Sequence, residues 1–156
     1  MKIYQIHSKQ NLPITVKEAW DFLSDPLNLS IITPDYMNFD IISGADRSVY
    51  TGQLIQYTIT PIGKFRIQWV TEIVGVKERF HFVDEQKYGP YKLWHHKHFL
   101  KEIPGGVEME DIVDYIVPGG FLGRLVHPFL VKPKLNEIFA YRKTALEERF
   151  GVYNPS

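Results

Sequence analysis

Alternation of apolar and polar residues is the main pattern between residue 37 and residue 117. It recurs in short segments that are rich in β-branched and aromatic residues and are separated by Gly, Pro, Asn or Asp. These segments are 37–42, 51–60, 64–74, 79–84, 91–103 and 107–117. Their pattern predicts strands, and their short connections predict antiparallel pairing between neighbours. The earlier segment 2–12 predicts a first strand that ends at Pro13.

Helical spacing is found toward the two ends of the chain. Thr15 and Glu18 form a capping-box sequence ahead of a short apolar stripe, and a second short helix is predicted over 27–32. Near the C-terminus the positions at helical intervals are Leu135, Ile138, Phe139, Arg142 and Leu146. They predict a long amphipathic helix. The preceding segment 119–132 is strongly apolar, and Pro128 and Pro133 predict a kink or an interruption there.

This order of elements predicts a single α+β domain over residues 1–156. A first strand, two short helices, several consecutive strands and one long C-terminal helix favour an antiparallel sheet that wraps around the last helix. A chain of 156 residues is long enough to bury a core of its own. No internal repeat or linker divides it.

Composition and charge narrow the functional classes. The chain has no cysteine, so neither a disulfide framework nor a thiolate metal site or nucleophile is available. Eighteen basic and eighteen acidic residues cancel without forming a basic cluster, and nucleic acid is therefore not an expected partner. No apolar segment is long enough to span a bilayer, and the N-terminal residues lack a secretory signal. We expect a soluble, cytoplasmic protein without stable membrane insertion.

The main candidate functional residues lie on one predicted hairpin. Trp94, His96 and His98 are two residues apart and therefore share a strand face. Pro104-Gly105 suits a type II turn closed by Ile103 and Gly106. That register sets three pairs opposite one another on the same face: Trp94 with Tyr115, His96 with Val113, and His98 with Asp111. A large aromatic and two imidazoles on one face favour the wall of a cavity, in line with an aromatic content of 14%.

Three interpretations of this face remain open. His98 and Asp111 can be a buried hydrogen-bonded pair that serves structure alone. They can instead supply the polar contacts that orient an otherwise apolar ligand. Thirdly, the two histidines with a facing carboxylate could hold Zn or Fe, or His98 oriented by Asp111 could act as a general base. No further metal ligand is identifiable, so we expect no metal and no cofactor.

Residues along nearly the whole chain carry a resemblance to a known family. They are Leu12-Pro13, Trp20, Asp25-Pro26-Leu27-Asn28-Leu29, Phe82-Val83-Asp84, Gly89-Pro90-Tyr91, Trp94-His95-His96-Lys97-His98, Asp111, Tyr115, Leu122-Gly123 and Ile138-Phe139-Ala140-Tyr141-Arg142. With them the chain resembles the START-related (SRPBCC) superfamily of ligand-binding domains, which also contains polyketide cyclases and the major birch pollen allergen. The Gly-Pro-Tyr and Trp-x-His-x-His elements are similar to those of a bacterial branch. Leu100 and Pro128 depart from the pattern of that branch.

The resemblance implies the helix-grip fold, a curved antiparallel sheet around a long C-terminal helix, with a deep and mostly apolar cavity between them. The residues expected at the ligand are Trp94, His96, His98, Asp111, Val113 and Tyr115 from the sheet, and Phe129, Phe139 and Arg142 from the C-terminal segment. We expect Arg142 to reach a carboxylate, a carbonyl or an anionic ligand head. Asp84 and Gln86 share a strand face with Phe82 and can either line the cavity or cap the sheet edge. The structural role at the sheet edge is favoured.

The function predicted is binding of a hydrophobic or amphipathic small molecule, lipid-like or polyketide-like, by a monomer or a weak homodimer. An alternative is a cyclase or dehydratase that uses His98 with Asp111 in the same cavity; beyond that alternative no catalytic residue is assigned, and enzymatic activity is not favoured. A third possibility is a protein-interaction module whose apolar segment 121–131 is the contact surface.

Overall fold

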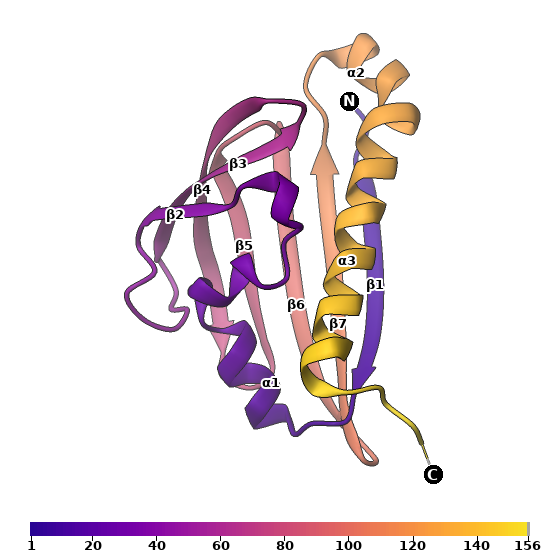
Figure 1. Cartoon of the computed structure of the whole chain (residues 1–156). Helices are drawn as coiled ribbons and strands as arrows, with labels where there is room; N and C mark the ends of the chain where they lie inside the picture. Colours follow the sequence, from indigo (N-terminus) through magenta and orange to yellow (C-terminus); the bar gives the residue numbers. More distant parts are fainter. Residues whose placement is uncertain (156) are drawn as a thin grey trace.

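The computed structural model describes residues 1–155 and contains one seven-stranded antiparallel sheet, whose strand order is β1-β7-β6-β5-β4-β3-β2. The strands are β1 (Tyr4–Leu12), β2 (Asp40–Ser43), β3 (Leu54–Ile62), β4 (Phe65–Lys77), β5 (His81–Tyr88), β6 (Leu93–Ile103) and β7 (Gly106–Ile116). Consecutive strands pair from β2 to β7, and β1 closes the far edge against β7. The sheet is strongly curved (Figure 1).

Helices cover the concave side of this sheet. α1 (Val16–Leu23) follows the first strand and has the predicted capping box, because Thr15 Oγ1 accepts from the Glu18 backbone and the Glu18 carboxylate accepts from the Thr15 backbone. The second short helix predicted over 27–32 is a 3₁₀ turn at Pro26–Ser30, with Asp25 as its N-cap. Another 3₁₀ turn, Asp35–Met37, leads into β2.

The C-terminal helical segment runs without a break from residue 120 to residue 150. α2 (Gly120–Val126) is followed by a π-helical turn at His127–Val131 and then by α3 (Lys132–Phe150). Pro128 and Pro133, which have no N–H to donate, lie in the wide turn and in the first turn of α3. The prolines therefore mark a π-helical turn between α2 and α3 and do not separate the helices.

The long helix α3 packs against the sheet as the helical spacing predicted. Leu135, Phe139, Arg142 and Leu146 are buried, and α3 runs alongside β7 and β1 (Figure 1). Gln10 of β1 donates from Nε2 to the Lys143 carbonyl of α3 at 2.8 Å. A curved antiparallel sheet that holds one long C-terminal helix is the helix-grip fold.

The β6–β7 hairpin has the register that its turn predicted. Ile103 pairs with Gly106, His98 with Asp111, His96 with Val113, and Trp94 with Tyr115. Gly105 has a φ of +75°, which a type II turn requires at its third position and which glycine adopts without strain. Within residues 1–155, no helix is both long enough and apolar enough to cross a membrane.

Candidate functional site

A cavity of about 390 Å³ lies between the concave face of the sheet and α3. Its wall is apolar over most of its extent and comes from the sheet, the 3₁₀ region and the C-terminal segment. Representative wall residues are Leu29, Ile55, Trp69, Trp94, Leu135 and Phe139. They belong to three separate apolar clusters of the core or pack against them, so the cavity lies where these clusters meet.

One part of the wall is ionisable. Asp84, His96, His98 and Arg142 line the cavity, and the Asp111 carboxylate lies next to them. His98 Nε2 is 2.7 Å from Asp84 Oδ2, and His96 Nε2 is 2.9 Å from Asp111 Oδ1. The Asp111 oxygen is also 3.0 Å from His98 Nδ1 and 3.3 Å from Arg142 Nη2. The five side chains form one buried ionic cluster.

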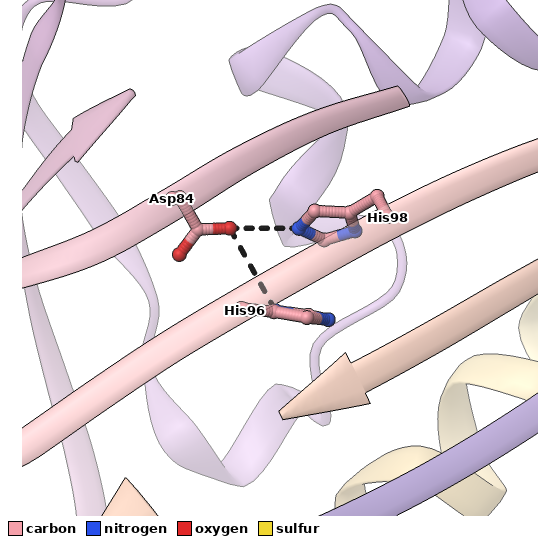
Figure 2. Close-up of side chains that lie close together, drawn as sticks. All are labelled: Asp84, His96 and His98. Carbon is pink, nitrogen blue, oxygen red and sulfur yellow. Dashed lines mark hydrogen bonds and ion pairs between the residues drawn. The ribbon is translucent and has the colours of Figure 1, made fainter. Parts of the chain in front are cut away.

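Strand pairing on both sides of β6 brings this cluster together. β5 sets Asp84 opposite His96 and Phe82 opposite His98, and β7 sets Asp111 opposite His98. Directly paired residues point to the same face of a sheet, so both carboxylates flank the two imidazoles. The His96 and His98 rings lie 3.7 Å apart, and Phe82 stacks on the His98 ring at 4.1 Å. Figure 2 shows Asp84 on the neighbouring strand with one oxygen directed at both rings.

Neighbouring positive charges and hydrogen bonds stabilise the ionised forms of Asp84 and Asp111. Burial alone would raise the pKa of Asp111, but the Arg142 guanidinium and the hydrogen bonds from His96 and His98 hold it well below its usual value. Burial likewise opposes ionisation of Asp84, yet the hydrogen bond from His98 and the nearby positive charges lower its pKa. Both side chains are therefore carboxylates at neutral pH.

The two imidazoles differ in protonation. Burial and the neighbouring His98 charge lower the pKa of His96. Burial also disfavours the charged form of His98, but hydrogen bonding and attraction to Asp111 and Asp84 outweigh it and raise the pKa. A protonated His98 and Arg142 then balance the charges of Asp84 and Asp111, as a buried ionic cluster requires.

Two buried N–H groups in the cavity wall have no acceptor among the described residues. They are Trp69 Nε1 and Arg142 Nε. His98 Nδ1 also makes no well-aligned hydrogen bond, since its 3.0 Å contact with Asp111 Oδ1 is an ion pair with poor hydrogen-bond geometry. Buried polar groups are normally satisfied, so these groups mark the polar side of the cavity as a place for an acceptor.

The helical segment 121–131 forms one rim of the cavity. Gly123, Val126, Leu130 and Val131 line it. Phe121, Leu122, Leu125 and Phe129 project outward as exposed apolar side chains. Phe129, which was expected at the ligand, is 84% exposed and does not line the cavity, because Leu130 and Val126 occupy the inward side of this turn.

A hydrogen bond joins this rim to the sheet. The Tyr115 hydroxyl and His127 Nε2 are hydrogen-bonded at 2.7 Å, and the His127 ring stacks on Tyr4 at 3.6 Å. Burial and the nearby Lys132 and Lys2 charges lower the pKa of His127, which keeps the imidazole neutral at pH 7. Tyr115 therefore supports the rim from below, as part of the core.

The structure places most predicted residues at the cavity or next to it. Trp94, His96, His98, Phe139 and Arg142 line it. Asp111 belongs to the ionic cluster directly behind the wall, and Val113 and Tyr115 are buried in the adjoining core. Sequence reasoning undervalued Asp84, for which structural support of the sheet was favoured. Its alternation with Phe82 is the available signal, but no simple turn in the sequence specifies how β5 pairs with β6.

Comparison with known proteins bears on the fold. No protein-family model and no curated protein matches the sequence significantly. Among solved structures, TTHA0849 from Thermus thermophilus is 12% identical, with 94% of this chain and 97% of that chain covered and a TM-score of 0.74. The Zhui aromatase/cyclase from a Streptomyces species is 10% identical, with 95% and 93% covered and a TM-score of 0.74. Ara h 8.0201 is 15% identical, with 94% and 99% covered and a TM-score of 0.62.

The chain therefore has the same helix-grip fold as these three structures. At these identities the likeness concerns the fold, and it confirms the fold that the sequence resemblance implied. Assignment to the bacterial branch with the Trp-x-His-x-His element stays a prediction.

Proposed function

We propose that this protein binds a mostly apolar small molecule with one polar end in the cavity between the sheet and α3. The observation that carries the proposal is the composition of the wall, which is mostly apolar and has the ionic cluster on one side. A volume of about 390 Å³ lies within the range typical of small-molecule sites. An apolar wall of this size favours the transfer of hydrocarbon groups from water.

The polar end of the ligand is argued from the unpaired donors. A buried N–H without an acceptor is unfavourable by about 1–3 kcal/mol, and an oxygen on the ligand near Trp69 Nε1 or Arg142 Nε would recover part of this. Carboxylate, carbonyl and hydroxyl groups all supply such an oxygen. Lipid-like and polyketide-like compounds combine these groups with a large apolar part, and the likeness to an aromatase/cyclase supports ring compounds as one class.

Dye binding tests the cavity with a matched pair of tryptophan variants. Trp94 lines the cavity, whereas Trp20 is buried against Phe82 and does not line it. An environment-sensitive naphthalene sulfonate dye should quench tryptophan emission in the wild type. Trp94→Ala should weaken dye binding about tenfold, because an aromatic wall contact is lost. Trp20→Ala should lower stability and leave the affinity of the folded protein unchanged. Equal affinity in wild type and folded Trp94→Ala would contradict the proposal.

Competition against the bound dye tests the polar end. A long-chain fatty acid should displace the dye at lower concentration than the alkane of equal length. Trp69→Phe keeps the aromatic ring but removes the N–H, and should weaken fatty-acid binding about fivefold while alkane binding changes little. If the fatty acid and the alkane displace the dye at equal concentrations, the proposal that the ligand has a polar end is wrong.

A second candidate is an enzyme of the cyclase or dehydratase kind. The observation that favours it is the position of His98 between Asp84 and Asp111 on the cavity wall, since a carboxylate can orient an imidazole for proton transfer. Excess compound recovered from the purified protein would be incubated with catalytic amounts of enzyme and followed by mass spectrometry and chromatography. Conversion that is lost in His98→Gln supports this candidate, and unchanged compound excludes it for that ligand.

A further inference from the structure

Three potential metal-ligating atoms converge on the cavity wall. His98 Nε2 is 2.7 Å and His96 Nδ1 is 3.7 Å from the same oxygen of Asp84, and one ligand atom from each residue lies within 4.8 Å of the others (Figure 2). Imidazole nitrogen and carboxylate oxygen are donors that Zn²⁺ and Fe²⁺ accept. We propose that Asp84, His96 and His98 form a binding site for a divalent transition-metal ion.

Asp111 supports this site from the opposite side of the two rings. Its Oδ1 lies 2.9 Å from His96 Nε2 and 3.0 Å from His98 Nδ1. Histidines that bind metal usually donate their other N–H to a carboxylate, which fixes the tautomer. His96 Nε2 is hydrogen-bonded to Asp111, and His98 Nδ1 lies close to it. When a metal ion displaces the proton between His98 Nε2 and Asp84, the lone pairs of His96 Nδ1 and His98 Nε2 both face Asp84. The cluster therefore contains both the ligands and the carboxylate that orients them.

The distances from Asp84 to the two histidine nitrogens are close to the spacing of ligand atoms around a metal ion. Bonds of about 2.1 Å place neighbouring ligand atoms about 3.0 Å apart in octahedral geometry and about 3.4 Å apart in tetrahedral geometry. The two distances to Asp84 Oδ2, 2.7 and 3.7 Å, lie on either side of these values. All three ligand atoms lie within 4.8 Å of one another, so the two imidazole rings must move closer together to bind one ion.

The local charge also favours a cation. In the metal-free site a protonated His98 helps to balance the two carboxylates. Once a metal ion displaces that proton, the carboxylates of Asp84 and Asp111 outweigh the Arg142 guanidinium by one negative charge. Arg142 approaches Asp111 Oδ1 at 3.3 Å and so contacts the supporting carboxylate. The carboxylate between the rings and the guanidinium reduces repulsion between Arg142 and a bound ion.

Three protein ligands leave part of the coordination sphere to other groups. Asp84, His96 and His98 all line the cavity, so the remaining positions face the space where a small molecule would lie. Open sites with three protein ligands are typical of metals that bind water or substrate. The sequence alone suggested the facing carboxylate of Asp111 as the partner of the two histidines and identified no further ligand. Asp84 was not recognised, because it lies on a different strand, β5, outside the hairpin that carries the histidines. This site goes beyond the proposed binding function and does not depend on it.

Titration of chelator-treated protein with ZnCl₂ tests the site. Calorimetry should show one equivalent bound with micromolar or tighter affinity, weakened at least about 100-fold in Asp84→Asn and about 10- to 100-fold in Asp111→Asn. His95→Gln is the matched control: His95 lies on the same strand and contacts Glu85 at 2.7 Å, but on the outer face. It should bind Zn²⁺ as the wild type does. Equal affinity in Asp84→Asn, or an equal loss in His95→Gln, would overturn the proposal.

A measurement on the wild type guards against variants that fail to fold. Two-dimensional NMR of the histidine side chains should show Zn²⁺ shifting the His96 Nδ1 and His98 Nε2 resonances, while their other nitrogens stay protonated. Co²⁺ should give the visible absorption of a four- or five-coordinate ion. Shifts confined to other histidines, or the spectrum of hydrated Co²⁺, would overturn the proposal, because the ion would then be bound elsewhere.

Discussion

Replacing Asp111 with asparagine removes one negative charge from the buried ionic cluster of the cavity wall. Asp111 Oδ1 contacts His96 Nε2, His98 Nδ1 and Arg142 Nη2 at 2.9, 3.0 and 3.3 Å. The variant leaves Arg142 and a protonated His98 with Asp84 as their one carboxylate. Breaking a buried ion pair by changing one partner is typically unfavourable by about 3–5 kcal/mol.

We expect Asp111→Asn to lose about 3 kcal/mol of unfolding free energy at neutral pH, the lower end of that range, because release of the His98 proton restores neutrality. For a chain of this length the melting temperature should fall by about 6–12 °C. Urea denaturation of chelator-treated protein measures the free energy directly, and the slope with denaturant should be unchanged.

Asp114→Asn on the same strand is the control. Asp114 contacts Lys97 at 2.9 Å on the outer face and is partly exposed. Asp114→Asn should therefore lower the free energy of unfolding by less than about 1 kcal/mol. The double variant Asp111→Asn/Arg142→Met should lose about 1–2 kcal/mol less unfolding free energy than the sum of the losses in the two single variants. Equal effects of Asp111→Asn and Asp114→Asn, or strict additivity of the pair, would refute the reasoning.

Two further predictions concern the rim of the cavity. Backbone amides in 121–131 should exchange with deuterium faster than those in 135–146, because the rim exposes apolar side chains and includes a proline that donates no hydrogen bond; equal protection would exclude opening of the cavity at this segment. The lowered pKa of His127 means that the unfolded chain binds more protons below about pH 6.5, so the stability that neutral His127 contributes is present above that pH and is lost as the pH falls through the folded pKa. Between about pH 7.5 and about pH 5.5, the wild type should therefore lose more unfolding free energy than His127→Gln, as measured by denaturation at the two pH values. Identical losses in the two proteins would exclude this contribution.

Local patterns in the sequence predicted the fold because each feature depends on near neighbours. Alternation predicted the strands, and the capping box at Thr15 predicted the start of α1. The Pro104-Gly105 turn fixed the β6–β7 register, since hairpin pairing follows from turn geometry. The helical spacing from Leu135 to Leu146 predicted the face of α3 that the sheet covers.

From the sequence, only the part of the site that lies on the β6–β7 hairpin was predicted. Trp94, His96 and His98 were placed on one face, and His98 was set opposite Asp111, from sequence alone. Asp84 was not placed with them, because β4 and β5 pair through bulges and the Tyr88–Lys92 connection has no simple turn register. Phe129 was expected at the ligand from the family resemblance, but in the π-helical turn it points outward while Leu130 and Val131 line the cavity.

Native mass spectrometry of freshly purified protein tests the central claim most directly. If the cavity binds an apolar compound with a polar end, a fraction of the protein should carry extra mass that is released on denaturation and recovered in an organic extract. The extracted compound should rebind to stripped wild-type protein and bind more weakly to Trp94→Ala. Protein of bare chain mass, with no extractable compound and no uptake of an apolar dye, would contradict the account.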